Sequence, residues 1–140
     1  MKLSTAISPT VLRRCDPVVA KDSVAYATLR TNGPCGGTQS ILAVYDIRDI
    51  NNPVQVNTAF VGEPYGLGYA DSALYICDRY SLIIFNISKP YEPQFVNSIP
   101  GDSYVDVIPD GNTLVCWVSE GVLLYDISER LNPQLITKIQ

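Results

Sequence analysis

The sequence contains no histidine, the side chain that most often acts as a general base and as a zinc ligand. Ser-His-Asp and Cys-His catalytic groups are therefore excluded. The chain also lacks a Gly-x-Gly-x-x-Gly motif, a phosphate-binding loop and a nucleophile elbow. None of the four cysteines has Cys-x-x-Cys spacing, so a zinc site is not expected. We expect neither a cofactor nor a metal.

Long hydrophobic runs and clusters of positive charge are absent as well. No run approaches the roughly 18 to 20 apolar residues that a membrane helix needs. The segment from Met1 to Cys15 has no continuous apolar stretch of the kind found in signal peptides. The ten lysines and arginines are scattered, and the net charge is −4. Nucleic-acid binding rests on clustered cations, so we expect no nucleic-acid partner and no transmembrane segment.

The chain does contain an internal repeat. Asp46, Asn86 and Asp126 are evenly spaced, and each follows a β-type apolar run. A proline follows at the same distance in each copy, at Pro53, Pro93 and Pro133. A fixed period of about 40 residues indicates a repeat fold. Asx side chains at the ends of strands accept hydrogen bonds from the following turn, so we interpret these three as structural.

Each period contains four short β-type segments separated by turn residues such as Asp110-Gly111. Four antiparallel strands per period predict an all-β fold made of β-propeller blades. We place the blades at residues 15–60, 61–100 and 101–140, with residues 3–14 as a linker and the outer strand of a preceding blade.

Three blades are fewer than the roughly four to eight of a closed propeller. Two explanations stay open. The chain is a C-terminal portion of a larger propeller, or two copies form a homodimer through their open blade faces. We favour the first.

The repeat resembles a known family. A buried strand that ends in Tyr/Phe-Asp/Asn-Ile-Ser, followed by the proline, is similar to the LVIVD repeat over roughly Cys15 to Ile139. The first copy differs, with Arg48 in place of Ser88 and Ser128. The resemblance implies a β-propeller protein of a bacterial cell surface or periplasm, often a lipoprotein. That family has no well-defined activity.

Candidate binding residues share one rim of the predicted blades, because the loops entering the innermost strands and those between the second and third strands emerge at the same end. Exposed tyrosines beside charges provide stacking area and hydrogen bonds. Residues predicted on this rim are Arg14, Asp16, Arg30, Tyr65, Arg79, Tyr80, Tyr104 and Asp106.

From this pattern we predict a non-enzymatic interaction or scaffold module that binds a protein partner or the remaining blades. One alternative is a module that binds a glycan or peptide at the channel mouth. Another is a hydrolase in which Asp16 and Asp106 act as acid and base.

The cysteines separate into two pairs. Cys15 and Cys35 lie at the same end of the first blade, so a disulfide between them is predicted, with two free thiols as the alternative. Cys77 and Cys116 occupy opposite faces of their strands in the repeat register, so we expect them to be buried and not to pair.

Overall fold

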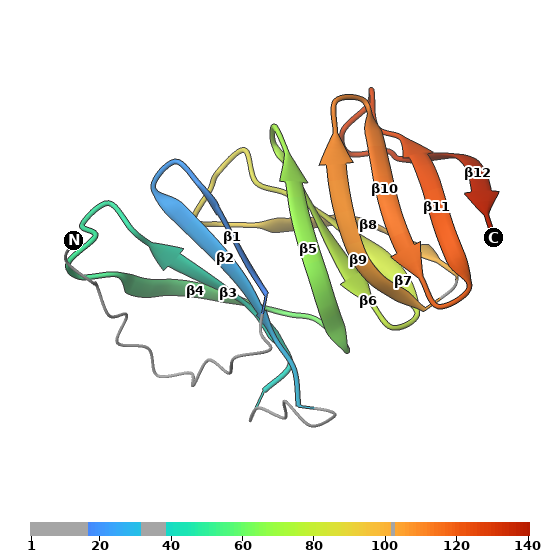
Figure 1. Ribbon diagram of the computed structural model, residues 1–140. Helices are drawn as coiled ribbons and strands as arrows, with labels where there is room; N and C mark the ends of the chain where they lie inside the picture. Colours follow the sequence, from blue (N-terminus) through green and yellow to red (C-terminus); the bar gives the residue numbers. More distant parts are fainter. Residues whose placement is uncertain (1–16, 32–38, 102) are drawn as a thin grey trace.

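The structure is a computed structural model that describes residues 17–31, 39–101 and 103–140. It contains three four-stranded antiparallel sheets that lie side by side along the chain (Figure 1). No helix occurs in these ranges, and hence none that could cross a membrane. The predicted all-β architecture of three four-stranded repeats is confirmed.

Each sheet is a simple meander in which consecutive strands pair. The first sheet contains β1 (Val18–Lys21), β2 (Val24–Leu29), β3 (Ile41–Asp46) and β4 (Val54–Phe60). The second contains β5 (Pro64–Ala70), β6 (Ala73–Asp78), β7 (Ser81–Asn86) and β8 (Gln94–Pro100). The third contains β9 (Tyr104–Asp110), β10 (Thr113–Val118), β11 (Gly121–Asp126) and β12 (Gln134–Ile139).

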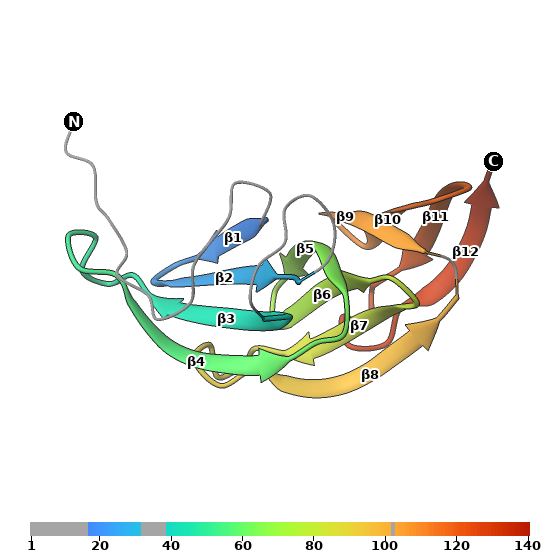
Figure 2. The ribbon, with the colours of Figure 1, turned by 90° about the horizontal axis from the view of Figure 1, so that it is seen from below.

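The two central strands of each sheet carry most of its buried apolar side chains. The outer strands β4, β8 and β12 are mostly exposed and pair on one side only. Figure 2 shows these outer strands along the convex side of the arc, with β1, β5 and β9 on the opposite side.

Local hydrogen bonds explain why the repeat sequence is so regular. Asp46 Oδ1 accepts the Arg48 N–H at 3.0 Å, and Asp126 Oδ1 accepts the Ser128 N–H at 2.8 Å. Asn86 Oδ1 does the same in the second sheet at 2.8 Å. These bonds close the turn that follows each third strand. The predicted structural role of the three Asx residues is confirmed.

Apolar side chains fill the two spaces between neighbouring sheets. One core cluster joins the first and second sheets and includes Tyr26, Leu42 and Leu74. A second joins the second and third sheets and includes Tyr75 and Leu114. Burying this area supplies the main stabilisation, at about 25 cal/mol per Å² of apolar surface. No sheet could shelter both of its faces alone, so the blades depend on one another.

Cys77 and Cys116 correct one step of the sequence reasoning. As expected, the two side chains point to opposite faces in the repeat register. However, the second and third sheets are neighbours, so the face of the second sheet that carries Cys77 packs against the face of the third sheet that carries Cys116. Both side chains therefore belong to the same buried cluster between the second and third sheets. They are free thiols. The expected absence of a bond agrees with the structure, whereas the geometric reason given for it was wrong.

Two glycines let the innermost strands β5 and β9 approach closely. A Cβ atom on Gly66 would lie 2.8 Å from Asp106 Cα, and one on Gly68 would lie 2.8 Å from Pro109 Cδ. Real Cβ atoms do not approach other heavy atoms so closely. The pair Gly66 and Gly68 is therefore needed for the packing of adjacent blades at their inner edge.

Candidate functional site

The rim predicted from the sequence is formed by three described segments. The first is Arg30, directly after β2. The second is the connection from β4 to β5 with Glu63, together with Tyr65 near the start of β5. The third is the tight turn between β6 and β7 with Arg79 and Tyr80. All three emerge at one end of the first two sheets because the strands alternate in direction.

Arg30 and Tyr65 come together across the junction of the first two sheets. The Arg30 guanidinium carbon lies 4.4 Å from the centroid of the Tyr65 ring, within the range of a cation–π contact. The buried Thr28 hydroxyl donates to the Tyr65 carbonyl at 2.8 Å and fixes the backbone beneath the ring. Within the described ranges, Arg30 has no carboxylate partner. In this part of the chain, its charge is therefore available to an anionic or polar ligand.

Arg79 is held by its neighbours instead. Its Nη1 atom donates to Glu63 Oε2 at 3.2 Å, and its guanidinium lies 5.3 Å from the Tyr80 ring centroid. The hydrogen bond to Glu63 is the main cause of a raised Arg79 pKa. The carboxylate of buried Asp78 accepts the N–H groups of Gly62 and Glu63, each at 3.1 Å. These two hydrogen bonds from its backbone to Asp78 fix the loop that carries Glu63.

Asp106 and Tyr104, both on β9 of the third sheet, differ in solvent exposure. Asp106 is exposed beside Gly66, and its Oδ1 accepts the Val107 N–H at 2.9 Å. Tyr104 is only 1% exposed, and its hydroxyl lies 2.8 Å from that of Tyr125 in the core. The prediction of Tyr104 as a rim residue is therefore wrong. Its ring faces inward because the strand that carries it packs on the second sheet.

Four predicted site residues lie outside the described residues: Arg14, Asp16, Cys15 and Cys35. The rim contributions of the first two and the disulfide predicted for the other two stay predictions. Arg30, Tyr65, Arg79 and Tyr80 form two cation–aromatic pairs. No three His, Cys, Asp or Glu side chains of the described ranges gather closely enough to hold a metal ion.

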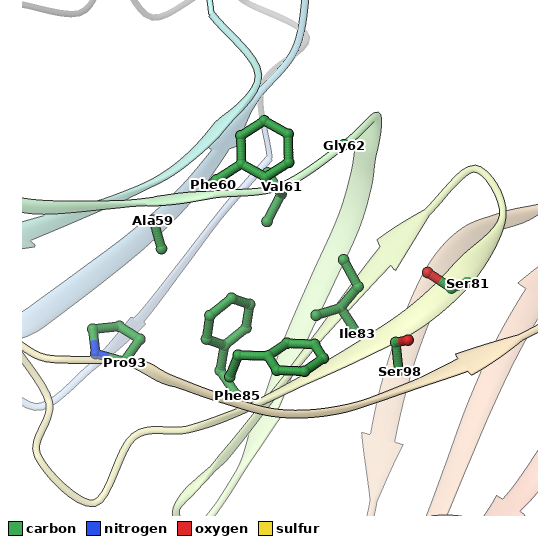
Figure 3. Close-up of a pocket in the computed structure, with 10 residues that line it drawn as sticks. Ala59, Phe60, Val61, Gly62, Ser81, Ile83, Phe85, Pro93 and Ser98 are labelled. Atoms are coloured by element: carbon green, nitrogen blue, oxygen red, sulfur yellow. The ribbon is translucent and has the colours of Figure 1, made fainter.

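A groove that the sequence reasoning missed lies on the outer side of the first two sheets (Figure 3). It has a volume of about 470 Å³ between β4, β7 and β8. Phe60 is 86% exposed at its edge, and Phe95, which is 62% exposed, packs edge-on against Phe85 with ring centroids 6.2 Å apart. The signal for it was the presence of phenylalanine at outward-facing positions of outer strands.

Comparisons with known proteins identify the fold but not a family. No family model and no curated protein sequence matches the chain. Among solved structures, the chain is similar to a periplasmic gluconolactonase from Pseudomonas aeruginosa, with a TM-score of 0.65 and 12% sequence identity. The match covers 83% of this chain and 39% of that protein. The fold is that of a β-propeller.

The chain thus spans well under half the length of the protein that it matches. That protein is an enzyme, so the comparison contradicts our prediction of a non-enzymatic interaction or scaffold module. The error came from treating missing histidine and cofactor motifs as grounds for excluding catalysis. A propeller builds its site from side chains of several blades, and no short motif needs to mark it.

Proposed function

We propose that this chain forms part of a β-propeller hydrolase that opens a lactone, or a related ester, of a polyhydroxylated acid at the channel mouth. The observation that carries the proposal is the rim arrangement. Arg30, which has no carboxylate partner among the described residues, stacks on Tyr65, and the next residue, Gly66, lies against the exposed Asp106 of the third sheet. The likeness in fold to a gluconolactonase supports the choice of substrate class.

Arg30 and Tyr65 suit such a ligand. A sugar-derived ring offers hydroxyl groups at its edge and C–H groups on its face. The Tyr65 ring can pack against the C–H face, and the Arg30 guanidinium can donate hydrogen bonds to the hydroxyl groups. Hydrolysis converts the ester carbonyl into a carboxylate, which a guanidinium binds through two hydrogen bonds. In this proposal Arg30 stabilises the negative charge that develops on the carbonyl oxygen.

Asp106 is the proposed general base. Its Oδ1 is oriented by the Val107 N–H, and the group is exposed to water. It takes a proton from a water molecule, whose oxygen attacks the carbonyl carbon. The bond to the ring oxygen then breaks, and the ring oxygen accepts the proton from Asp106. The products are one carboxylic acid and one alcohol, and the acid releases a proton at neutral pH.

The test is hydrolysis of glucono-1,5-lactone by the whole protein that contains this chain, followed with a pH indicator against the spontaneous reaction. We expect a rate above the buffer blank that Asp106→Asn reduces at least about 100-fold, as loss of a general base does. Arg30→Gln should lower kcat by about 10-fold or more. Arg48→Gln, at the other end of the first sheet, is the matched control and should leave the rate unchanged. A rate equal to the blank, or one unaffected by Asp106→Asn, would refute the proposal.

We further propose that the protein is of the LVIVD-repeat type and acts outside the cytoplasm. The repeat motif in each sheet and the periplasmic source of the structural neighbour support this. Fractionation of cells that make the protein should then recover it with periplasmic or surface proteins. Recovery with cytosolic markers would contradict the assignment.

A further inference from the structure

The two junctions between sheets are built on the same plan at the end opposite the rim. In the second sheet the Ile87 N–H donates to the Ser72 carbonyl at 2.8 Å, and in the third the Ile127 N–H donates to the Asn112 carbonyl at 2.8 Å. These bonds place the loop after each third strand against the turn between the first two strands. The corresponding groups of the two junctions can therefore be compared one by one.

A buried tyrosine marks the same position in both junctions. The Tyr26 hydroxyl donates to the Pro90 carbonyl at 2.7 Å, and the Tyr75 hydroxyl donates to the Arg130 carbonyl at 2.6 Å. Pro90 and Arg130 are separated by one full repeat, like Asn86 and Asp126. They are thus equivalent residues, one with a short ring and one with a long cationic side chain.

The Arg130 side chain fills a built guanidinium site. Its Nε donates to Asp71 Oδ2 of the second sheet at 2.7 Å. Its Nη1 donates to the Gly111 carbonyl at 2.9 Å, to Asn112 Oδ1 at 3.2 Å and to the Ile127 carbonyl at 2.8 Å. One carboxylate and three neutral acceptors therefore surround this cation, and the two Nη1 hydrogens are shared among the three neutral oxygens.

The same place in the junction of the first and second sheets is a cavity of about 360 Å³. Its lining includes Asp22, Ser72, Ile87 and Pro90. These correspond in the repeat to Asp71, Asn112, Ile127 and Arg130, so the acceptors remain while the arginine is replaced by proline. Within the described ranges, the Asp22 carboxylate has no ionic partner.

Lys21 occupies one part of this site. Its ammonium group donates to the Asp71 carbonyl, the equivalent of the Gly111 carbonyl that Arg130 uses, and lies 5.8 Å from the Tyr69 ring centroid. The remaining acceptors, Asp22 with the Ser72 hydroxyl and the Ile87 carbonyl, are left to a ligand. The ammonium group of Lys21 brings one positive charge to this site and so limits its affinity for a second cation.

We propose that this cavity binds the guanidinium group of an arginine side chain or of a small guanidinium compound. The ligand would occupy the position that the Arg130 side chain occupies in the next junction, and its guanidinium would form an ion pair with the Asp22 carboxylate. This site lies at the opposite end of the sheets from the channel mouth, so it is independent of the proposed hydrolase activity.

The probe for a peptide arginine is N-acetylarginine amide, titrated into the 140-residue chain and followed by NMR. We expect saturable shifts at Asp22, Ser72 and Ile87. Methylguanidinium distinguishes the free compound from the side chain, and N-acetyllysine amide and urea are the matched controls for charge and shape. Equal responses to the lysine amide or to urea, or no saturable response to any guanidinium, would overturn the proposal.

Variants of the lining give a second, independent measurement. Asp22→Asn should weaken binding at least 10-fold, whereas Lys21→Met should tighten it several-fold because it frees the Asp71 carbonyl. Pro90→Arg supplies the guanidinium from the chain itself and should abolish binding while it raises the unfolding temperature. Binding that survives Pro90→Arg in a folded protein would contradict the assigned position.

The filled junction allows the converse experiment. Arg130→Ala should empty the second site and lower the unfolding temperature, and millimolar methylguanidinium should restore part of the loss through preferential binding to the folded state. Millimolar urea should not. If methylguanidinium gave no more recovery than urea, the two sites would not share the proposed chemistry.

Discussion

Replacing Tyr75 by phenylalanine tests the hydrogen bond that ties the second sheet to the third. The Tyr75 side chain is fully buried, and its hydroxyl donates to the Arg130 carbonyl at 2.6 Å. Phenylalanine keeps the ring and its packing, so the substitution removes only the hydroxyl. An intramolecular hydrogen bond contributes about 0.5–1.5 kcal/mol net. The loop that carries Arg130 is only half-buried, so water can reach the carbonyl, and we expect a loss of about 1 kcal/mol.

Urea unfolding followed by circular dichroism measures this loss. With a slope of about 2 kcal/mol per M for a domain of this size, the midpoint should fall by about 0.5 M. Tyr26→Phe removes the equivalent bond to Pro90 and should give a similar shift. Tyr80→Phe is the control, because that side chain is 64% exposed. A Tyr75→Phe midpoint equal to that of Tyr80→Phe would refute the reasoning, as would a fall larger than about 1.5 M.

The same hydroxyl predicts an alkaline limit of stability. Burial raises the pKa of Tyr75 from 10 to about 12, so the folded state favours the protonated phenol. The stabilising contribution is complete below pH 10 and is lost as the pH rises from 10 through 12. Ultraviolet difference absorbance, compared between the native protein and Tyr75→Phe, should show Tyr75 ionising near pH 12, and ionisation of Tyr75 near pH 10 would contradict this.

Other contacts give predictions for a glycine, two thiols and a carboxylate. Gly66→Ala should lower the free energy of unfolding by about 1–3 kcal/mol, because the added carbon meets backbone of the next sheet, and urea unfolding measures it. Burial raises the thiol pKa of both Cys77 and Cys116, so in a Cys15→Ser, Cys35→Ser background neither should react with Ellman's reagent until the protein unfolds. Hydrogen bonding from Arg48 lowers the pKa of Asp46 to about 2, so the stability it contributes is present above pH about 4 and lost as the pH falls through 2. Arg48→Ala should raise that pKa toward 3.8, which carboxyl NMR titration would show.

Each of these has a result that would count against it. For the glycine, the control is Gly101→Ala, where the new carbon would lie 3.4 Å from a tyrosine hydroxyl and should fit with little change. If the two alanine variants had equal free energies of unfolding, the close approach of β5 and β9 at Gly66 would not be what makes this glycine necessary. Rapid labelling of native protein at Cys77 or Cys116 would show that the cluster opens locally. An unchanged Asp46 pKa in Arg48→Ala would show that the turn, rather than the guanidinium, holds it low.

The sequence by itself determined the architecture within each repeat. Hydrophobic runs, turn residues and the Asx position act over a few neighbouring residues, so they can be recognised without knowing where distant segments lie. The turns confirm this: Asp22, Asp71 and Gly111 all adopt the positive φ that tight hairpins require. The same local logic correctly gave a structural role to Asp46, Asn86 and Asp126.

Only the tertiary structure decided which side chains meet across the junctions. Tyr104 and Asp106 are two residues apart, yet one hydroxyl is buried against Tyr125 and the other side chain faces solvent. The stacking of Arg30 on Tyr65 and the empty counterpart of the Arg130 site likewise depend on how two sheets are placed side by side. The repeat period defines the four strands of a sheet, but the contacts between sheets depend on packing between residues that are distant in the chain.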